Sequence, residues 1–331
     1  MLFYFCSMIN IDKIFKISNS QEFNRLAIKI YNFQYNNNAV YRKFCDLSKK
    51  NPVNVKEIFD IPFLPISFFK THKVLSSKKI EKTFFSSGTT DKVNSRHFIS
   101  DLNLYKKSFK TNFEINYGSP ENLTIIGLLP SYMENNDSSL IYMVDNLINK
   151  SNCKDSGFYL GENDLLIQKL LRLDRSGKKV LLIGVSYALL DLIEHRKISL
   201  KNTIIIETGG MKGRRKEMIK SELHQKLKSG FGLENIHSEY GMTELLSQAY
   251  SKKDGIFYCP PWMKIIIRDI NDAQNFNLNN KSGGINIIDL ANLNSCSFIA
   301  TDDLGKMEEG SSFQILGRID NSDIRGCNLL I

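Results

Sequence analysis

The stretch that decides the fold of this chain is Phe84-Phe85-Ser86-Ser87-Gly88-Thr89-Thr90-Asp91-Lys92. Two aromatic residues suit the end of a strand, and hydroxyl side chains around a glycine suit a tight turn. Backbone N–H groups and hydroxyls that converge on one point form an anion site, for which phosphate is the natural ligand. An ordinary polar turn would use the same residues, so the phosphate interpretation depends on the rest of the chain.

Strand and helix patterns alternate after this stretch. Short apolar runs predict buried strands at residues 123–129, 180–185 and 203–206, and helical spacing predicts helices at 137–148, 186–193 and 214–228. Parallel strands need crossover connections, usually helices, so the alternation predicts an α/β fold with a mostly parallel sheet. Ligands of such sheets gather at the carboxyl ends of the strands, where this stretch and the Gly209-Gly210 turn both lie.

The two ends of the chain have other patterns. Residues 10–50 are expected to be helical, with Ser20 as a helix cap. Residues 58–70 are apolar but contain Pro62 and Pro65, which favours an extended, buried segment. After about residue 255 the pattern changes to short strands at 264–270, 284–290 and 297–301. We therefore expect an N-terminal helical segment, residues 1–80, packed on a core domain, residues 81–331, whose last part is a small β-rich lobe.

Composition narrows the class of protein. The 331 residues are 42% hydrophobic and 24% charged, which is ordinary for a soluble globular chain of one or two domains. The net charge of +9 suggests a polyanionic partner, but the densest basic run, residues 212–220, lacks interleaved aromatic residues, so no nucleic-acid partner is expected. The six cysteines form no C-x-x-C pair, which argues against zinc and disulfides and favours the cytoplasm. No apolar run has the length of a membrane span.

A second motif is Glu239-Tyr240-Gly241-Met242-Thr243-Glu244. Tyr240 and Gly241 offer a flat ring beside bare backbone, which suits an aromatic base. Thr243 offers a hydroxyl, and Glu244 offers the hard oxygen ligand that Mg²⁺ prefers.

Two shorter motifs follow in the β-rich part, Thr301-Asp302-Asp303-Leu304-Gly305 and Gly317-Arg318-Ile319-Asp320. A carboxylate in the first can accept hydrogen bonds from ribose hydroxyls, and Arg318 in the second can hold a ribose or a phosphate. Each motif alone is weak evidence for a ligand, but the order and separation of the motifs indicate that they bind one nucleotide.

Together the four motifs resemble those of the adenylate-forming superfamily of acyl- and aryl-CoA ligases and luciferases. Within it the chain is most similar to the LuxE-type acyl-protein synthetases of the bacterial fatty acid reductase, over residues 58–331. That likeness includes three further stretches, Ile61-Pro62-Phe63-Leu64-Pro65-Ile66, Thr208-Gly209-Gly210-Met211-Lys212-Gly213 and Ile324-Arg325-Gly326-Cys327-Asn328-Leu329. The resemblance implies the adenylate-forming large-domain core. It also implies that the usual C-terminal lid, with its catalytic lysine, is lacking, and Lys92, Lys212 and Arg214 are candidate replacements for that cation.

The resemblance also implies roles for particular residues. The phosphates of ATP would be held by Ser86, Ser87, Gly88, Thr89 and Thr90. Gly209 and Gly210 would line the adenine and acyl pocket, with Tyr240 and Gly241 against adenine. Thr243 would contact the α-phosphate, Glu244 would hold Mg²⁺, and Asp303 would bind ribose beside Arg318. The superfamily's glycine after the threonines is Asp91 here; aspartate tolerates left-handed backbone better than most residues.

The implied reaction is the activation of a carboxylic acid, with a fatty acid favoured, to an acyl-adenylate. Family members carry the acyl group on a cysteine near the C-terminus, which would be Cys327, and pass it to a partner acyl reductase. A thiolate is a strong nucleophile, although a free cysteine is by default a packing residue. Two alternatives stay open: a CoA ligase of the phenylacetate-CoA ligase type, and a non-catalytic partner that binds a nucleotide or an acyl group. His97 and His237 are expected to be structural.

Overall fold

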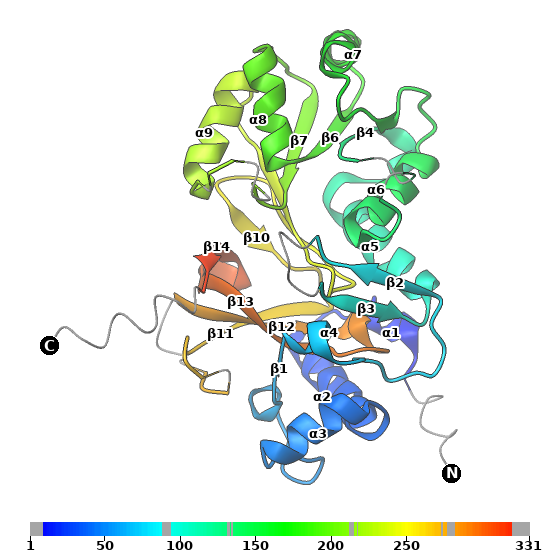
Figure 1. Cartoon of the computed structure of the whole chain (residues 1–331), viewed down its shortest axis with the longest axis vertical. Coiled ribbons are helices and arrows are strands. Elements are labelled where there is room, and N and C mark those ends of the chain that lie inside the picture. Colours follow the sequence, from blue (N-terminus) through cyan, green and yellow to red (C-terminus); the bar gives the residue numbers. More distant parts are fainter. Residues whose placement is uncertain are drawn as a thin grey trace, which may run out of the picture. The chain divides into compact units, whose positions relative to one another are not determined.

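The computed structural model describes residues 9–87, 94–130, 133, 135–211, 215–216, 218–272, 274–276 and 282–319 (Figure 1). The chain divides into two compact units. One contains residues 79–260, and the other combines residues 1–78 with residues 261–331. Each unit is described by itself below.

The unit of residues 79–260 is built on a sheet whose strand order is β5-β4-β6-β7-β8-β9-β10. Its strands are β4 (Thr124–Leu128), β5 (Gly157–Phe158), β6 (Val180–Val185), β7 (Thr203–Thr208), β8 (His237–Tyr240), β9 (Ala249–Ser251) and β10 (Ile256–Tyr258). The first five strands in the order are parallel, and β9 and β10 are antiparallel. The predicted strands at 123–129, 180–185 and 203–206 and the mostly parallel sheet are therefore confirmed.

Helices cover both faces of this sheet. The helical segments are α5 (Leu102–Tyr117), η3 (Pro120–Asn122), α6 (Ser139–Lys150), α7 (Asn163–Arg175), α8 (Ser186–His195) and α9 (Lys220–Phe231). Figure 1 shows α8 and α9 side by side on one face and α5 and α6 on the other. The predicted helix start at residue 214 is wrong, since α9 begins at Lys220. The helix starts instead where the Lys220 ammonium pairs with the buried Glu207 carboxylate.

The succession of strands reverses between β4 and β6. The chain passes from β4 to the edge strand β5, and then crosses back to β6, β7 and β8 on the other side of β4. Open α/β sheets have a crevice beyond the carboxyl ends of the strands at such a reversal, and ligands bind there. A separate antiparallel hairpin, β2 (Lys82–Phe85) and β3 (Arg96–Ile99), carries the hydroxyl-rich stretch between its two strands.

The other unit has an antiparallel sheet, β11-β12-β13-β14, with β1 added parallel to β13. Its strands are β1 (Leu64–Pro65), β11 (Met263–Arg268), β12 (Ser282–Asp289), β13 (Phe298–Met307) and β14 (Phe313–Arg318). Its helical segments are α1 (Ile11–Ile14), α2 (Ser20–Asn37), α3 (Ala39–Leu47), η2 (Ile58–Asp60), α4 (Phe68–Thr71), η4 (Leu290–Asn292) and η5 (Glu309–Ser311). The short strands predicted after residue 255 are present.

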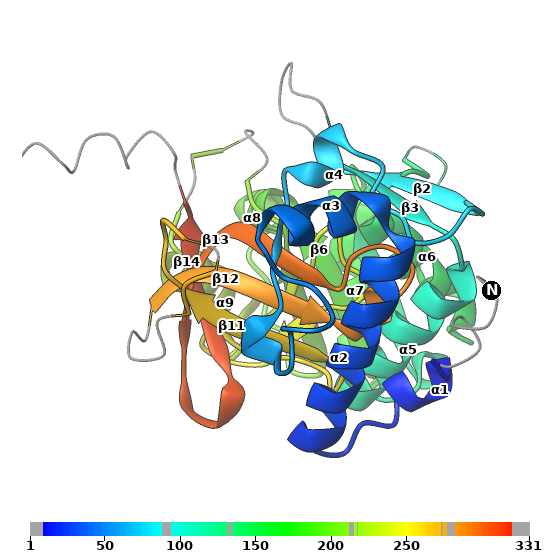
Figure 2. The same ribbon diagram turned by 90° about the horizontal axis from the view of Figure 1, so that it is seen from below.

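Figure 2 shows α2 next to α3 in this unit. A buried amide anchors α2 to residues beside the sheet. The Gln34 Nε2 atom lies 2.9 Å from the Asn292 carbonyl and 3.1 Å from the Ser297 Oγ, and its Oε1 accepts from the Ser297 N–H. The predicted cap at Ser20 is off by one residue, because the Asn19 side chain accepts from the Glu22 N–H and Ser20 is already helical. The predicted extended segment 58–70 is a strand only at β1.

Of the helices described, none combines the length and the apolar character needed to cross a bilayer.

Candidate functional site

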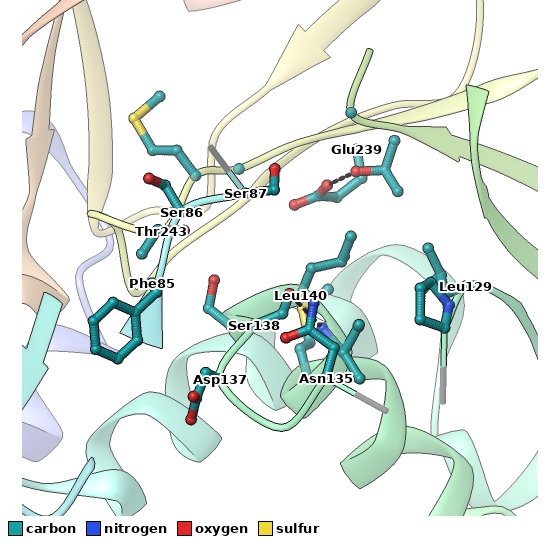
Figure 3. A pocket seen from close by; sticks show the side chains of 18 of the residues that line it. Phe85, Ser86, Ser87, Leu129, Asn135, Asp137, Ser138, Leu140, Glu239 and Thr243 are labelled. Carbon is teal, nitrogen blue, oxygen red and sulfur yellow. Dashed lines mark hydrogen bonds between the residues drawn. The ribbon is translucent and has the colours of Figure 1, made fainter. Parts of the chain in front are cut away.

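A cavity of about 620 Å³ opens at the carboxyl edge of the sheet in the unit of residues 79–260 (Figure 3). Its walls come from the end of β2, from the connection between β4 and α6, and from the residues that follow β7 and β8. The Ser138 Oγ in that connection accepts from the Ile141 N–H and so caps α6. The cavity therefore lies at the edge where the strand order predicts a ligand.

Ser86 and Ser87 line the cavity where β2 ends. The Ser86 N–H donates to the Ser95 carbonyl, and the Ser95 N–H donates to the Ser86 Oγ at 2.9 Å. This pair of bonds extends the hairpin past its last strand residues and fixes the start of the hydroxyl-rich stretch. The remaining predicted phosphate ligands, Gly88, Thr89 and Thr90, lie outside the described residues.

Gly209 lines the cavity directly after β7, and its φ of 65° is in the left-handed region that favours glycine. The Ser186 hydroxyl, at the first position of α8, lies 2.9 Å from the Gly209 carbonyl and 3.1 Å from Glu207 Oε2, and it donates to one of them at a time. This hydroxyl links the turn after β7 to the start of α8. Gly210 is exposed and is not among the lining residues.

Thr243 lines the cavity in the turn after β8, and a buried histidine holds that turn. The His97 ring on β3 lies with Nδ1 2.8 Å from the Thr243 carbonyl. A carbonyl only accepts, so Nδ1 carries a hydrogen and donates. Burial lowers the pKa of His97 to about 4, so the ring is neutral at pH 7. The expectation that His97 is structural agrees with this geometry, and its bond ties the hairpin to the second motif.

Glu239, the first residue of the second motif, is a pocket residue for which no role was predicted. It lines the cavity, is 7% exposed, and its Oε2 accepts from the Thr208 hydroxyl on the neighbouring strand (Figure 3). Burial raises the pKa of Glu239 to about 7, with a further rise from Glu207. The signal that would have found it is strand alternation: Glu239 and Gly241 share one face, whereas Tyr240 faces the other way.

Beneath this edge, Glu207 is fully buried and charged. Burial alone would raise its pKa, but the nearby Lys220 ammonium and bonds from neighbouring side chains lower it to about 2. Lys220 Nζ bonds Glu207 Oε1, and the His224 ring lies 3.3 Å from the same oxygen and 3.0 Å from the Ser238 Oγ. Adjacent residues of β7 thus serve two sites, with Thr208 facing the cavity and Glu207 facing α9.

Gly241 lets two polar side chains of the cavity pack closely against the backbone, where a larger residue would collide with them. A Cβ on Gly241 would lie 2.3 Å from Glu239 Oε1 and 3.2 Å from Gln248 Cγ. Gln248 also lines the cavity and is 5% exposed. Among the residues described, its Oε1 has no hydrogen-bond partner.

Other predicted site residues lie away from the lining. Tyr240 is 8% exposed and packs edge-on against Phe257 at 6.1 Å between ring centroids. Glu244 is buried beside Thr243 but is not a lining residue. Asp303 and Arg318 belong to the other unit, where they are register partners on β13 and β14 with Nε 3.5 Å from Oδ1. Cys327 lies outside the described residues.

The raised pKa of Glu239 predicts a pH dependence of stability. The folded chain keeps this proton up to about pH 7, whereas the unfolded chain releases it near 4.5, so the stability from this group is complete below pH 4.5 and is lost as the pH rises to 7. The loss is up to about 3 kcal/mol. We expect Glu239→Gln to remove this loss.

The check is urea unfolding from pH 4.5 to 7.5, taken as the difference between wild type and variant. His97 and His237, whose pKa values are lowered by burial, give an opposite slope in part of this range, and the difference cancels it. A difference that is constant with pH would contradict the assignment.

Comparisons with known proteins agree with this arrangement. Residues 15–331 match the family described as acyl-protein synthetase, LuxE. A long-chain-fatty-acid–luciferin-component ligase from Vibrio harveyi is 25% identical over 330 residues, which are 92% of this chain and 86% of that protein.

Two solved structures share the fold. ATP-bound MatB from Rhodopseudomonas palustris superposes with a TM-score of 0.55 at 16% identity, over 72% of this chain and 48% of MatB, so the match spans about half of MatB. A 2-hydroxyisobutyryl-CoA ligase in complex with 2-HIB-AMP superposes with a TM-score of 0.65 at 12% identity, over 91% of this chain and 68% of that one. The chain has the fold of the adenylate-forming enzymes, and it belongs to the acyl-protein synthetase (LuxE) family of ligases.

Proposed function

We propose that this chain uses MgATP to convert a carboxylic acid into an acyl-adenylate and then transfers the acyl group to Cys327. The observation that carries the proposal is the cavity, which brings Ser86, Gly209 and Thr243 from three distant segments to one edge of the sheet. In the first step a carboxylate oxygen attacks the α-phosphorus of ATP, the bond from the α-phosphorus to the bridging oxygen breaks, and pyrophosphate leaves.

The chain's own groups fit a nucleotide at this site. The Ser86 and Ser87 hydroxyls at the cavity suit the phosphates, and the left-handed turn at Gly209 lets the backbone approach a flat base closely. The Thr243 hydroxyl would donate to an α-phosphate oxygen and stabilise the charge that develops there. Tyr240, Asp303 and Arg318 remain candidates for adenine and ribose.

Glu244 is the candidate Mg²⁺ ligand. Mg²⁺ in such sites is held by one or two carboxylates together with substrate phosphates, and Glu244 is a buried carboxylate next to a cavity residue. When bound, the ion would neutralise negative charge on the phosphates during the attack. Glu244 would hold the ion, while Thr243 would orient the α-phosphate.

A fatty acid is the favoured substrate class. The Vibrio harveyi relative is named as a ligase of a long-chain fatty acid and a luciferin component. That name and the family description support an acyl chain as cargo and a protein as acceptor. In the second step the Cys327 thiolate attacks the acyl carbonyl carbon, the bond to AMP breaks, and a thioester and AMP result. An acyl reductase would then take the acyl group.

The test is ATP–pyrophosphate exchange with a panel of fatty and aromatic acids. We expect exchange in the wild type and a loss of about 10²- to 10³-fold in kcat for Thr243→Val, which keeps the side-chain shape but removes the hydroxyl. Thr243→Ser keeps the donor and is the matched control, so it should retain most of the activity. A folded wild type that exchanges with no acid would overturn the proposal.

A further inference from the structure

Ser186 is a buried hydroxyl residue that stands behind the Gly209 turn. It is the first residue of α8, follows β6 directly and is 1% exposed. β6 and β7 are parallel, with Val185 opposite Thr208, so Ser186 lies beside the turn that follows β7. Ser186 is not a lining residue of the cavity, so it can act on a bound molecule only through its neighbours.

The Ser186 hydroxyl bonds to the end of β7 rather than to its own helix. Hydroxyls at the start of a helix commonly accept from the free N–H groups of the first turn. The N-cap residue of α8 is Val185, which makes no such side-chain bond. The Ser186 Oγ lies instead 2.9 Å from the Gly209 carbonyl oxygen and 3.1 Å from Glu207 Oε2. The hydroxyl therefore serves the turn at the cavity.

Glu207 holds the same hydroxyl from the other side. Its Oε1 bonds Lys220 Nζ and lies 3.3 Å from the His224 ring on α9, while its Oε2 faces Ser186. A buried ion pair is weak evidence for added stability, because apolar residues of similar volume often serve equally well. The pair with Lys220 does fix the plane of the carboxylate, and with it the place of the Ser186 oxygen.

The turn needs a tether because it contains two glycines in succession. Gly209 has a φ of 65°, and the exposed Gly210 follows it. Glycine has the widest choice of backbone conformations, so a turn built on two of them would populate several orientations of its peptide groups. A hydrogen bond to the Gly209 carbonyl selects one orientation.

We propose that Ser186 is a positioning residue for ATP, and that its hydroxyl holds the Gly209 turn in the conformation that receives the flat base. This proposal rests on the nucleotide site proposed above. Ser186→Ala removes one hydrogen bond and keeps every lining residue of the cavity. Because one buried hydrogen bond changes an equilibrium constant about tenfold, we expect the KM for ATP to rise about tenfold. The kcat should stay within about threefold of the wild type, since ground-state binding is what is lost.

The measurement is ATP–pyrophosphate exchange at varied ATP, with melting curves to show that each variant is folded. Ser186→Thr keeps the hydroxyl and should bring the KM for ATP back to within about threefold of the wild type. Ser151→Ala is the matched control, because it removes a hydroxyl that donates to the Leu123 carbonyl at 2.6 Å, away from the cavity lining. Its KM should be unchanged. If Ser186→Ala does not fold, Ser186→Cys replaces it, since a thiol of similar size is a weak donor.

The outcomes separate this proposal from adenylation itself. A lower melting temperature or kcat with an unchanged KM for ATP would show that Ser186 only supports the fold, and would overturn the assignment. An equal rise in KM in folded Ser186→Thr and Ser186→Ala would overturn it too. No exchange with any acid overturns adenylation, and calorimetric titration with ATP then decides the role of Ser186. Binding about tenfold weaker in Ser186→Ala than in the wild type supports the role, whereas equal binding, or none by the wild type, overturns it.

Discussion

Lys220→Met is expected to destabilise the fold by about 3–5 kcal/mol, because it leaves Glu207 as a buried charge without its cation. Glu207 is fully buried, and its low pKa depends on the Lys220 ammonium acting against burial. Ser186 and His224 would remain as partners, but neither replaces the positive charge held by Lys220. The fall in stability is measured by urea unfolding at pH 7, where the unfolded carboxyl is ionised.

The matched control is Lys226→Met on the same helix. Lys226 pairs with Glu222 one turn away, and both side chains are about half exposed, so the variant should change stability by less than about 1 kcal/mol. The double variant Lys220→Met with Glu207→Gln lacks the buried charge that Lys220→Met alone leaves without a partner. It should therefore recover part of the lost stability. Equal losses for Lys220→Met and Lys226→Met would show that the Glu207 ion pair does not support the fold.

Cys327→Ser is expected to abolish the covalent acyl-protein while ATP–pyrophosphate exchange continues. In the proposed reaction adenylation takes place in the cavity, whereas the transfer step needs a thiolate, a far better nucleophile than a serine hydroxyl at neutral pH. The measurement is incubation with MgATP and a radiolabelled fatty acid, followed by gel separation of the protein with and without neutral hydroxylamine, which cleaves thioesters.

Cys153→Ser is the control for general loss of a thiol. Cys153 is a partly exposed thiol whose Sγ lies 3.1 Å from the Thr124 hydroxyl, and the label should persist in this variant. If a hydroxylamine-sensitive label persists in Cys327→Ser, the acyl group is attached to a residue other than Cys327. Formation of acyl-CoA by the wild type, with Cys327 dispensable, would select a CoA ligase instead.

Three strands of the parallel core, β4, β6 and β7, could be predicted because each is a short, largely apolar run with helices before and after it. β6 has the predicted bounds, and β4 and β7 differ by one or two residues. The predicted starts of the helices were less accurate. At α2 and α9 the chain offers several polar residues in a row, and backbone geometry selects one of them: Asn19 as the cap of α2, and Lys220, paired with Glu207, as the start of α9.

The cavity was predictable in part. Ser86, Ser87, Gly209 and Thr243 belong to motifs with a recognisable composition, and the structure places all four at one cavity. No role was predicted for Glu239 or Gln248. Alternation along β8 places Glu239 on the same face as Gly241, but the sequence does not show that this face borders a cavity. Their burial at the cavity arises only when β8 and β9 pair.

The bond from His97 to the Thr243 carbonyl joins residues 146 positions apart in sequence. It connects the hairpin that carries the first motif directly to the turn that carries the second. A chimaera that takes only one of these two segments from another ligase would contain only one partner of this hydrogen bond. Exchanging the hairpin together with the turn is therefore the sounder way to recombine enzymes of this family.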